Sequence, residues 1–131
     1  MKKTLDKYQP LSVAIPVFLV CQAMDFIFRG RLHYLLNSKA IFGLALDNQL
    51  AIFLSVLLLL LCYVLIKTNS NKMLLALFVG GSMSNIIDRI FYGGVVDYIN
   101  LFNISIINLA DIAIVSSLIC ISWQFLNKKN I

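Results

Sequence analysis

Six aspartates and no glutamate supply the acidic side chains of this chain, and four of the aspartates lie in otherwise apolar sequence. The four are Asp25, Asp88, Asp97 and Asp111. An ionisable side chain inside a bilayer is energetically costly, so by default it marks a functional position. Asp6, in the basic N-terminal segment, and Asp47, outside the apolar stretches, are expected to be solvated instead.

Asp97 and Asp111 are the two of these four that have no basic residue of their own at helical spacing. Two carboxyl groups that lie close together, partly shielded from water, cannot both ionise easily, so the pair holds one proton near neutrality. The charged member can then activate a water molecule, and the neutral member can protonate a departing amine. Such a pair needs no nucleophilic serine, metal or histidine.

The other two aspartates have polar neighbours at helical spacing. Asn85, Asp88 and Arg89 stand at i, i+3 and i+4, so they are expected to share one helix face. Asp25 and Arg29 stand at i and i+4. For Asp25, Arg29, Asp88 and Arg89, buried ion pairs and hydrogen bonds that fix helix packing remain open beside a chemical role.

Two further spacings concern the same helices. Asn108 and Asp111 stand at i and i+3 near the start of the last apolar stretch. Gly80 and Ser84 form a small-xxx-small pair, which lets another helix approach closely. We assign packing, and no chemistry, to that pair.

The composition predicts that membrane helices position these residues. Of the 131 residues, 60% are hydrophobic and only 13% are charged, whereas a soluble domain carries about 25% charged residues. The expected spans are about 11–28, 49–66, 73–91 and 104–125. We therefore predict an all-α integral membrane protein, one domain over 1–131, with four transmembrane helices and a small extracytoplasmic β/loop element from segments 29–48 and 92–103. Gly93-Gly94 predicts a turn at the start of the second segment.

The basic residues give the expected orientation of these spans. Seven fall on one side of the four-span arrangement: Lys2, Lys3, Lys7, Lys67, Lys72, Lys128 and Lys129. Four fall at or near the other side: Arg29, Arg31, Lys39 and Arg89. The excess places both termini in the cytoplasm, with Asp97 and Asp111 toward the outer face. This arrangement is not that of a nucleic-acid-binding surface.

Cysteine and histidine are too sparse for a metal centre. Cys21, Cys62 and Cys120 lie far apart inside apolar stretches and are expected to be small packing residues. His33 is the one histidine, so we expect no metal and no cofactor.

The two N-terminal lysines and Cys21 resemble a lipoprotein signal peptide. Val20 is too large for the cleavage site of such a peptide, so we expect the first span to remain part of the protein.

These residues occur in motifs that resemble one family. The stretch GGSMSNIIDRIFYGGVVDYI resembles the motif G-G-x-x-x-N-x-x-D-R, then V-V-D-[FY], of lipoprotein signal peptidases (signal peptidase II). IINLADIAI resembles their F-N-x-A-D-x-x-I motif, and LHYLLNSKAIF resembles their outer segment. Asp25 and Arg29 match a D-x-x-x-[KR] pair in the first helix, so the resemblance spans nearly the whole chain.

The resemblance implies an intramembrane aspartic endopeptidase with Asp97 and Asp111 as the catalytic pair. It implies that seven residues line, orient or support the site: Asn37, Asn85, Asp88, Arg89, Asn108, Asp25 and Arg29. The family cleaves the signal peptide of a bacterial prolipoprotein before its diacylglyceryl-cysteine, at the outer face of the cytoplasmic (inner) membrane, and globomycin-type cyclic peptides block it. The implied partners are lipid-modified signal peptides and membrane lipids, not nucleic acid, and a monomer is adequate.

The chain departs from the family pattern outside the chemical positions. Both outer segments are shorter than usual, Ile107 replaces a phenylalanine, and Lys39 replaces a glycine.

Two other functions remain open. One is a small four-helix proton-linked transporter that uses Asp88 or Asp111. The other is a non-catalytic relative that binds lipidated peptides.

Overall fold

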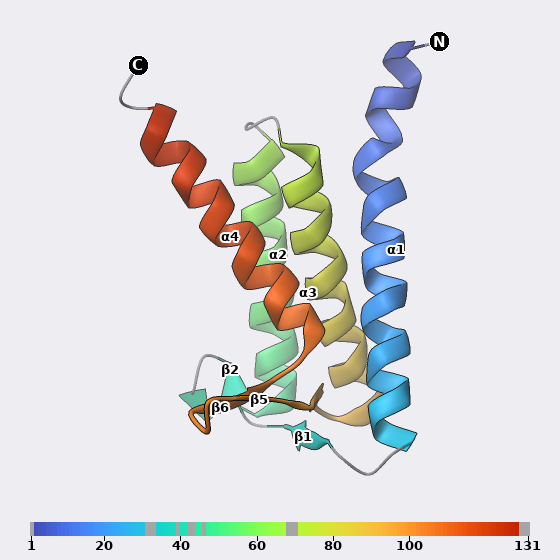
Figure 1. Cartoon of the computed structure of the whole chain (residues 1–131), viewed down its shortest axis with the longest axis vertical. Helices are drawn as coiled ribbons and strands as arrows, with labels where there is room; N and C mark the ends of the chain where they lie inside the picture. Colours follow the sequence, from blue (N-terminus) through green and yellow to red (C-terminus); the bar gives the residue numbers. More distant parts are fainter. Residues whose placement is uncertain are drawn as a thin grey trace.

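The computed structural model describes residues 2–30, 34–38, 40–41, 44–45, 47–67 and 71–128. Along the chain the elements are α1 (Lys2–Gly30), β1 (Leu35–Asn37), β2 (Ala40–Ile41), β3 (Leu44–Ala45), α2 (Asn48–Lys67), α3 (Lys72–Tyr92), β4 (Val95–Asp97), β5 (Ile99–Leu101), β6 (Ser105–Ile107) and α4 (Leu109–Lys128). The helices lie alongside one another, and the strands gather at the end opposite the first turn of α1 and the last turn of α4 (Figure 1). Four residues discussed above lie outside the described residues: Arg31, His33, Lys39 and Lys129.

The helices have the length and composition of membrane spans. Within the described residues, three stretches are long and apolar enough to cross a bilayer: Ser12–Gly30, Lys72–Tyr92 and Leu109–Asn127. The apolar stretch of α2, Asn48–Val64, is shorter, although the whole helix has 20 residues, which is about 30 Å at 1.5 Å per residue. The expected all-α integral membrane protein is confirmed.

Helix α3 is the centre of the bundle. Half of its apolar stretch is buried, against 17% for α1 and 22% for α4, and α3 contacts α1, α2 and α4. A Cβ atom at Gly80 would lie 2.7 Å from the Ala14 carbonyl oxygen of α1, and one at Gly81 would lie 2.8 Å from the Ala110 carbonyl oxygen of α4. Two adjacent glycines thus admit two helices on different sides, and the close approach predicted at Gly80 is confirmed.

The predicted turn after α3 is present, and it leads into a strand. Gly93 ends the helix in the left-handed conformation, with φ of 75°, which glycine adopts without steric cost. Gly94 lies against the backbone of Asn37, where an added Cβ would be 2.9 Å from the carbonyl oxygen. Strand β4 then pairs antiparallel with β1, with Asn37 opposite Val95. The strands expected in segment 29–48 are present as β1 and the antiparallel β2–β3 pair.

Helix α4 begins later than expected. The sequence suggested a span over 104–125, but Ser105–Ile107 forms β6 and pairs antiparallel with β5. The run of isoleucines that suggested a helix fits a strand equally well, because β-branched residues favour strands. Asn108 then caps α4, since its Oδ1 accepts the Asp111 N–H at 2.8 Å.

Candidate active site

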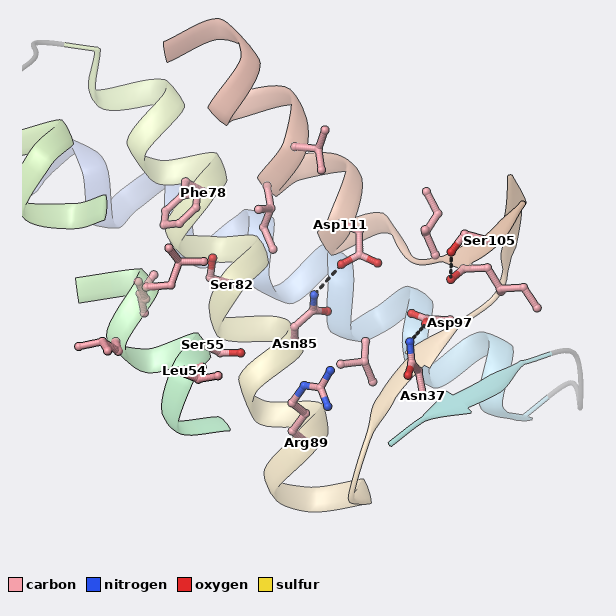
Figure 2. Close-up of a pocket in the computed structure, with 18 of the residues that line it drawn as sticks. Asn37, Leu54, Ser55, Phe78, Ser82, Asn85, Arg89, Asp97, Ser105 and Asp111 are labelled. Carbon is pink, nitrogen blue, oxygen red and sulfur yellow. Dashed lines mark hydrogen bonds between the residues drawn. The ribbon is translucent and has the colours of Figure 1, made fainter. Parts of the chain in front are cut away.

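A cavity of about 680 Å³ lies among α2, α3, α4 and the strands. Its polar lining side chains include Asn37, Asn85, Arg89, Asp97 and Asp111. Apolar side chains such as Leu54, Leu57, Phe78 and Ile114 line the rest. Figure 2 shows Asp97 and Asp111 together at the end near the strands, with Leu54 and Phe78 farther along the helices. The cavity is therefore a largely apolar groove with one polar end.

Asp111 is held by the start of α4 and by α3. Its Oδ2 accepts the backbone N–H of Asn108 at 3.2 Å, while Asn108 Oδ1 accepts the Asp111 N–H, so the two residues form a reciprocal cap. Its Oδ1 accepts a hydrogen bond from Asn85 Nδ2 at 2.8 Å. Asn108 Nδ2 in turn donates to Asn85 Oδ1 at 2.9 Å. These donors and the helix N-terminus stabilise a negatively charged Asp111 in one orientation.

Asp97 ends β4 and is only 2% exposed. Its Oδ2 accepts one hydrogen bond, from Asn37 Nδ2 at 3.1 Å, and among the described residues its Oδ1 has no hydrogen-bond partner. Burial raises the pKa of Asp97 to about 7, against the lowering by Asn37, and the charge of Asp111 raises it further. Asp97 therefore carries a proton at or just below neutral pH.

The two acids differ in a way that suits acid–base chemistry. Asp111 accepts two hydrogen bonds that favour its ionised form, whereas Asp97 accepts one and holds its proton. Arg89 lines the same cavity, and its positive charge offsets part of the rise in the pKa of Asp97. An acid that holds its proton, a second acid whose hydrogen bonds favour ionisation, and a cation in a largely apolar groove can transfer protons at a polar bond.

The residues expected around the two acids fall into two groups. Asn37, Asn85 and Arg89 line the cavity, and Asn108 is fully buried behind it, bonded to Asn85 and Asp111. Asp25, Arg29 and Asp88 do not line the cavity.

The expectation that Asn85, Asp88 and Arg89 share one face of α3 is wrong for Asp88. Asp88 is turned toward α1 and β4, where Gln22 Nε2 donates to its Oδ1 at 2.9 Å and the Val96 N–H donates to its Oδ2 at 3.2 Å. Residues at i and i+4 lie closer around a helix than residues at i+3 and i+4 do, so Arg89 stays with Asn85 while Asp88 diverges.

Of the buried ion pairs and hydrogen bonds that the sequence left open, hydrogen bonds hold both Asp25 and Asp88. Asp25 Oδ2 accepts a hydrogen bond from Ser84 Oγ at 3.4 Å. The guanidinium of Arg29 lies 3.6 Å from the centre of the Tyr92 ring, a cation–π contact. Asp88 accepts hydrogen bonds from Gln22 and from the Val96 N–H. A buried carboxylate can be satisfied by neutral donors, so the nearest cation in sequence need not be its partner.

Three residues around the site were missed from the sequence: Gln22, Ser84 and Tyr98. Gln22 carried a signal, because it is a polar residue inside an apolar span. Ser84 was assigned to packing alone, yet it hydrogen-bonds both Asp25 and Gln22.

Tyr98 stands at the last position of the V-V-D-[FY] motif, but its role was missed because that role depends on contacts between distant elements. Its hydroxyl accepts the Leu109 N–H at 3.3 Å, and its ring stacks on Phe28 with 4.1 Å between centroids. Burial raises the pKa of Tyr98, so its hydroxyl stays neutral.

Comparisons with known proteins agree on one family. The model of the family described as Signal peptidase (SPase) II matches residues 7–127. The chain is 37% identical to a lipoprotein signal peptidase of Moorella thermoacetica over 102 residues, 72% of this chain and 67% of the relative. It is 35% identical to that of Pelotomaculum thermopropionicum over 106 residues, 76% of this chain and 69% of the relative. The match to the relative from Caldicellulosiruptor bescii covers only 50% of that protein.

A solved structure of a bacterial membrane enzyme has the same fold. It superimposes with a TM-score of 0.76 over 92% of this chain and 89% of that one, at 20% identity. The sequence matches extend from α1 to the last turn of α4, which covers every element that builds the cavity. The chain is thus a bacterial membrane peptidase that belongs to the signal peptidase II family.

Proposed function

We propose that this protein is an aspartic endopeptidase that removes the signal peptide of bacterial prolipoproteins, with Asp97 and Asp111 as its two catalytic acids. One observation carries the proposal: two carboxyl groups from different elements, β4 and α4, line the polar end of one apolar groove. The substrate class comes from the relatives, which are lipoprotein signal peptidases.

Each acid has one task in the proposed reaction. Asp111, in its charged form, removes a proton from a water molecule, and the water oxygen attacks the carbonyl carbon of the scissile peptide bond. Asp97 donates its proton to the departing amide nitrogen as the C–N bond breaks. Asp111 is then protonated and Asp97 is ionised, and transfer of one proton from Asp111 to Asp97 restores the starting state.

The surrounding side chains support this division of tasks. Asn85 and the Asn108 N–H keep Asp111 charged and oriented, and Asn37 orients the protonated Asp97. Arg89 balances the charge of Asp111 inside the groove. Because the proton donor and the base are both held by the fold, little reorganisation is needed when the substrate arrives.

The apolar part of the groove suits the proposed substrate. Leu54, Leu57 and Phe78 give it a surface that an apolar signal-peptide segment or an acyl chain can contact. The proposal places the scissile bond at the polar end and the lipid-modified cysteine beside it.

The proposed orientation has both termini in the cytoplasm and the cavity toward the outer face. The strands lie at the end of the bundle opposite the first turn of α1 and the last turn of α4 (Figure 1). The polar end of the cavity is near these strands, since Asp97 ends β4 and Asn37 ends β1. Most of the lysines of the chain occur near those helix ends, at the end of α2 and at the start of α3. The positive-inside rule assigns that end to the cytoplasm.

Cleavage of a lipidated prolipoprotein peptide in detergent tests the proposal. Asp97→Asn and Asp111→Asn should each lower the rate by roughly 10³-fold or more, because each removes one half of the acid–base pair. Asp47→Asn is the matched control, since Asp47 is exposed and its cap of α2 can be made by asparagine. Size-exclusion chromatography and circular dichroism check that the variants fold.

The outcomes separate the possible functions. Full cleavage by both single variants would reject the two-acid mechanism. Wild-type protein that binds several lipidated peptides without cleaving any of them would be a non-catalytic relative.

A further inference from the structure

Gln22 of α1 links two groups on α3 that are buried from solvent. Its Nε2 donates to Asp88 Oδ1 at 2.9 Å and to Ser84 Oγ at 3.0 Å, and both acceptor residues are fully buried. Gln22 itself does not line the cavity.

Asp88 carries this link on to the strand that bears a catalytic acid. Its second oxygen accepts the N–H of Val96 at 3.2 Å, and Val96 immediately precedes Asp97. Strand β4 has three residues, and among the strands that the structure describes it pairs with β1 alone. A strand that short, with one partner strand, has few hydrogen bonds to hold it, so the contact from Asp88 is a large part of its support.

A neutral amide is well suited to hold Asp88. A buried carboxylate oxygen without a donor is strongly disfavoured, and an apolar side chain at position 22 would leave Oδ1 in that state. A lysine would supply a donor but would also bring a second buried charge. Glutamine supplies the hydrogen bond and leaves the charge near the cavity unchanged.

We infer that Gln22 is a positioning residue for the peptidase reaction: through Asp88 it fixes the backbone of β4 and so the place of Asp97. The inference rests on the proposed function of Asp97. It predicts that a residue on the far side of α3 from the cavity sets the rate of cleavage and leaves substrate binding unchanged.

Two substitutions test the inference by steady-state cleavage of a lipidated peptide. Gln22→Leu keeps the side-chain size but removes the donor, so kcat should fall by about tenfold with KM within about twofold, as expected for a misplaced catalytic group. Gln49→Leu is the matched control, because Gln49 is an exposed residue of α2. Loss of kcat in both leucine variants alike would overturn the inference.

Gln22→Glu separates positioning from a merely structural role. A glutamic acid donates a hydrogen bond only while it is protonated, so this variant should approach the wild-type kcat at acidic pH and lose it as the pH rises, more steeply than the wild type. The charged groups around position 22 that contribute to this titration are Asp25 and Arg29 on α1, Asp88 and Arg89 on α3, and Asp97 on β4. A pH profile identical to that of the wild type would contradict the inference.

Hydrogen exchange of the peptide that contains Val96 gives a readout independent of cleavage. Its amide should exchange faster in Gln22→Leu than in the wild type or in Gln49→Leu. The inference would be rejected if Gln22→Leu left both the exchange rate and kcat unchanged. The proposed function would still hold in that case, provided that Asp97→Asn is inactive. A wild type that cleaves no substrate would instead reject the proposed function, and the exchange result would still decide whether Gln22 holds β4.

Discussion

Helix α3 presents two polar faces that are built alike but do different things. Each face has a glycine, then a small polar or amide residue, then a charged residue, spaced four apart. They are Gly80, Ser84 and Asp88 on one face, and Gly81, Asn85 and Arg89 on the other. The first face is closed by α1 and its polar atoms bond to Gln22, Asp25 and β4. The second opens on the cavity.

The comparison shows that residue type alone does not assign a role to a buried charge. Asp88 is more buried than Asp97 is, yet both of its oxygens are occupied by protein donors, which suits an architectural role. Asp97 keeps one oxygen without a hydrogen-bond partner among the described residues, next to an open volume. What decides between support and chemistry is the space that faces the group.

Adjacent alanine substitutions give the largest expected contrast between the two faces. Asn85→Ala removes a donor from Asp111 and an acceptor from Asn108, so kcat should fall by roughly 100-fold. Ser84→Ala loses contacts to Asp25 and Gln22 but leaves the bond from Gln22 to Asp88, so kcat should fall by no more than about threefold. Single-turnover cleavage of a lipidated peptide measures both. Equal losses would mean that the two faces do not divide support and chemistry.

The paired glycines give a smaller and sharper contrast. In Gly81→Ala the new methyl group meets the Ala110 carbonyl one residue before Asp111, so kcat should fall by about tenfold as the start of α4 shifts. In Gly80→Ala it meets Ala14 in the middle of α1, so the Tm should fall by a few degrees with a loss of kcat of about twofold. Thermal unfolding in detergent and kcat are measured on the same samples. A larger kcat loss in Gly80→Ala would reverse the assignment of the faces.

The pH dependence of stability gives the smallest expected effect. The folded protein holds the Asp97 proton up to a pKa of about 7, whereas the unfolded chain releases it near the ordinary value of about 4. Between those values the folded state binds more protons, so the free energy of unfolding falls as the pH rises. The Tm should therefore drop by a few degrees from about pH 5 to about pH 8, and Asp97→Asn should show a smaller drop. The same slope in both proteins would exclude a raised pKa at Asp97.

Much of the site could be predicted from the sequence because its signals are local. Asp97 and Asp111 stood out as acids in apolar sequence without a basic neighbour, and both line the cavity. The reciprocal cap between Asn108 and Asp111 follows from their spacing of three residues at a helix start. The turn at Gly93 likewise depends on the glycine itself.

The remaining features depend on contacts between distant segments. The direction of Asp88 is set by Gln22 and Val96, which no spacing within α3 encodes. The segment Ser105–Ile107 is apolar enough to read as the start of a span, and only its pairing with β5 makes it a strand. Helical spacing gives the candidates for ion pairs, but the tertiary neighbours choose the partners.

The central claim is that Asp97 and Asp111 hold one proton between them and that Asp97 carries it. Infrared difference spectra of wild type against Asp97→Asn, recorded across a pH titration in detergent or lipid, test this most directly, since a protonated carboxyl group has its own carbonyl stretch. We predict that the wild-type-minus-variant difference contains a protonated-carboxyl band from Asp97, which is lost with a midpoint near 7. A midpoint near the ordinary carboxyl value, or a band that persists unchanged in Asp97→Asn, would contradict the account.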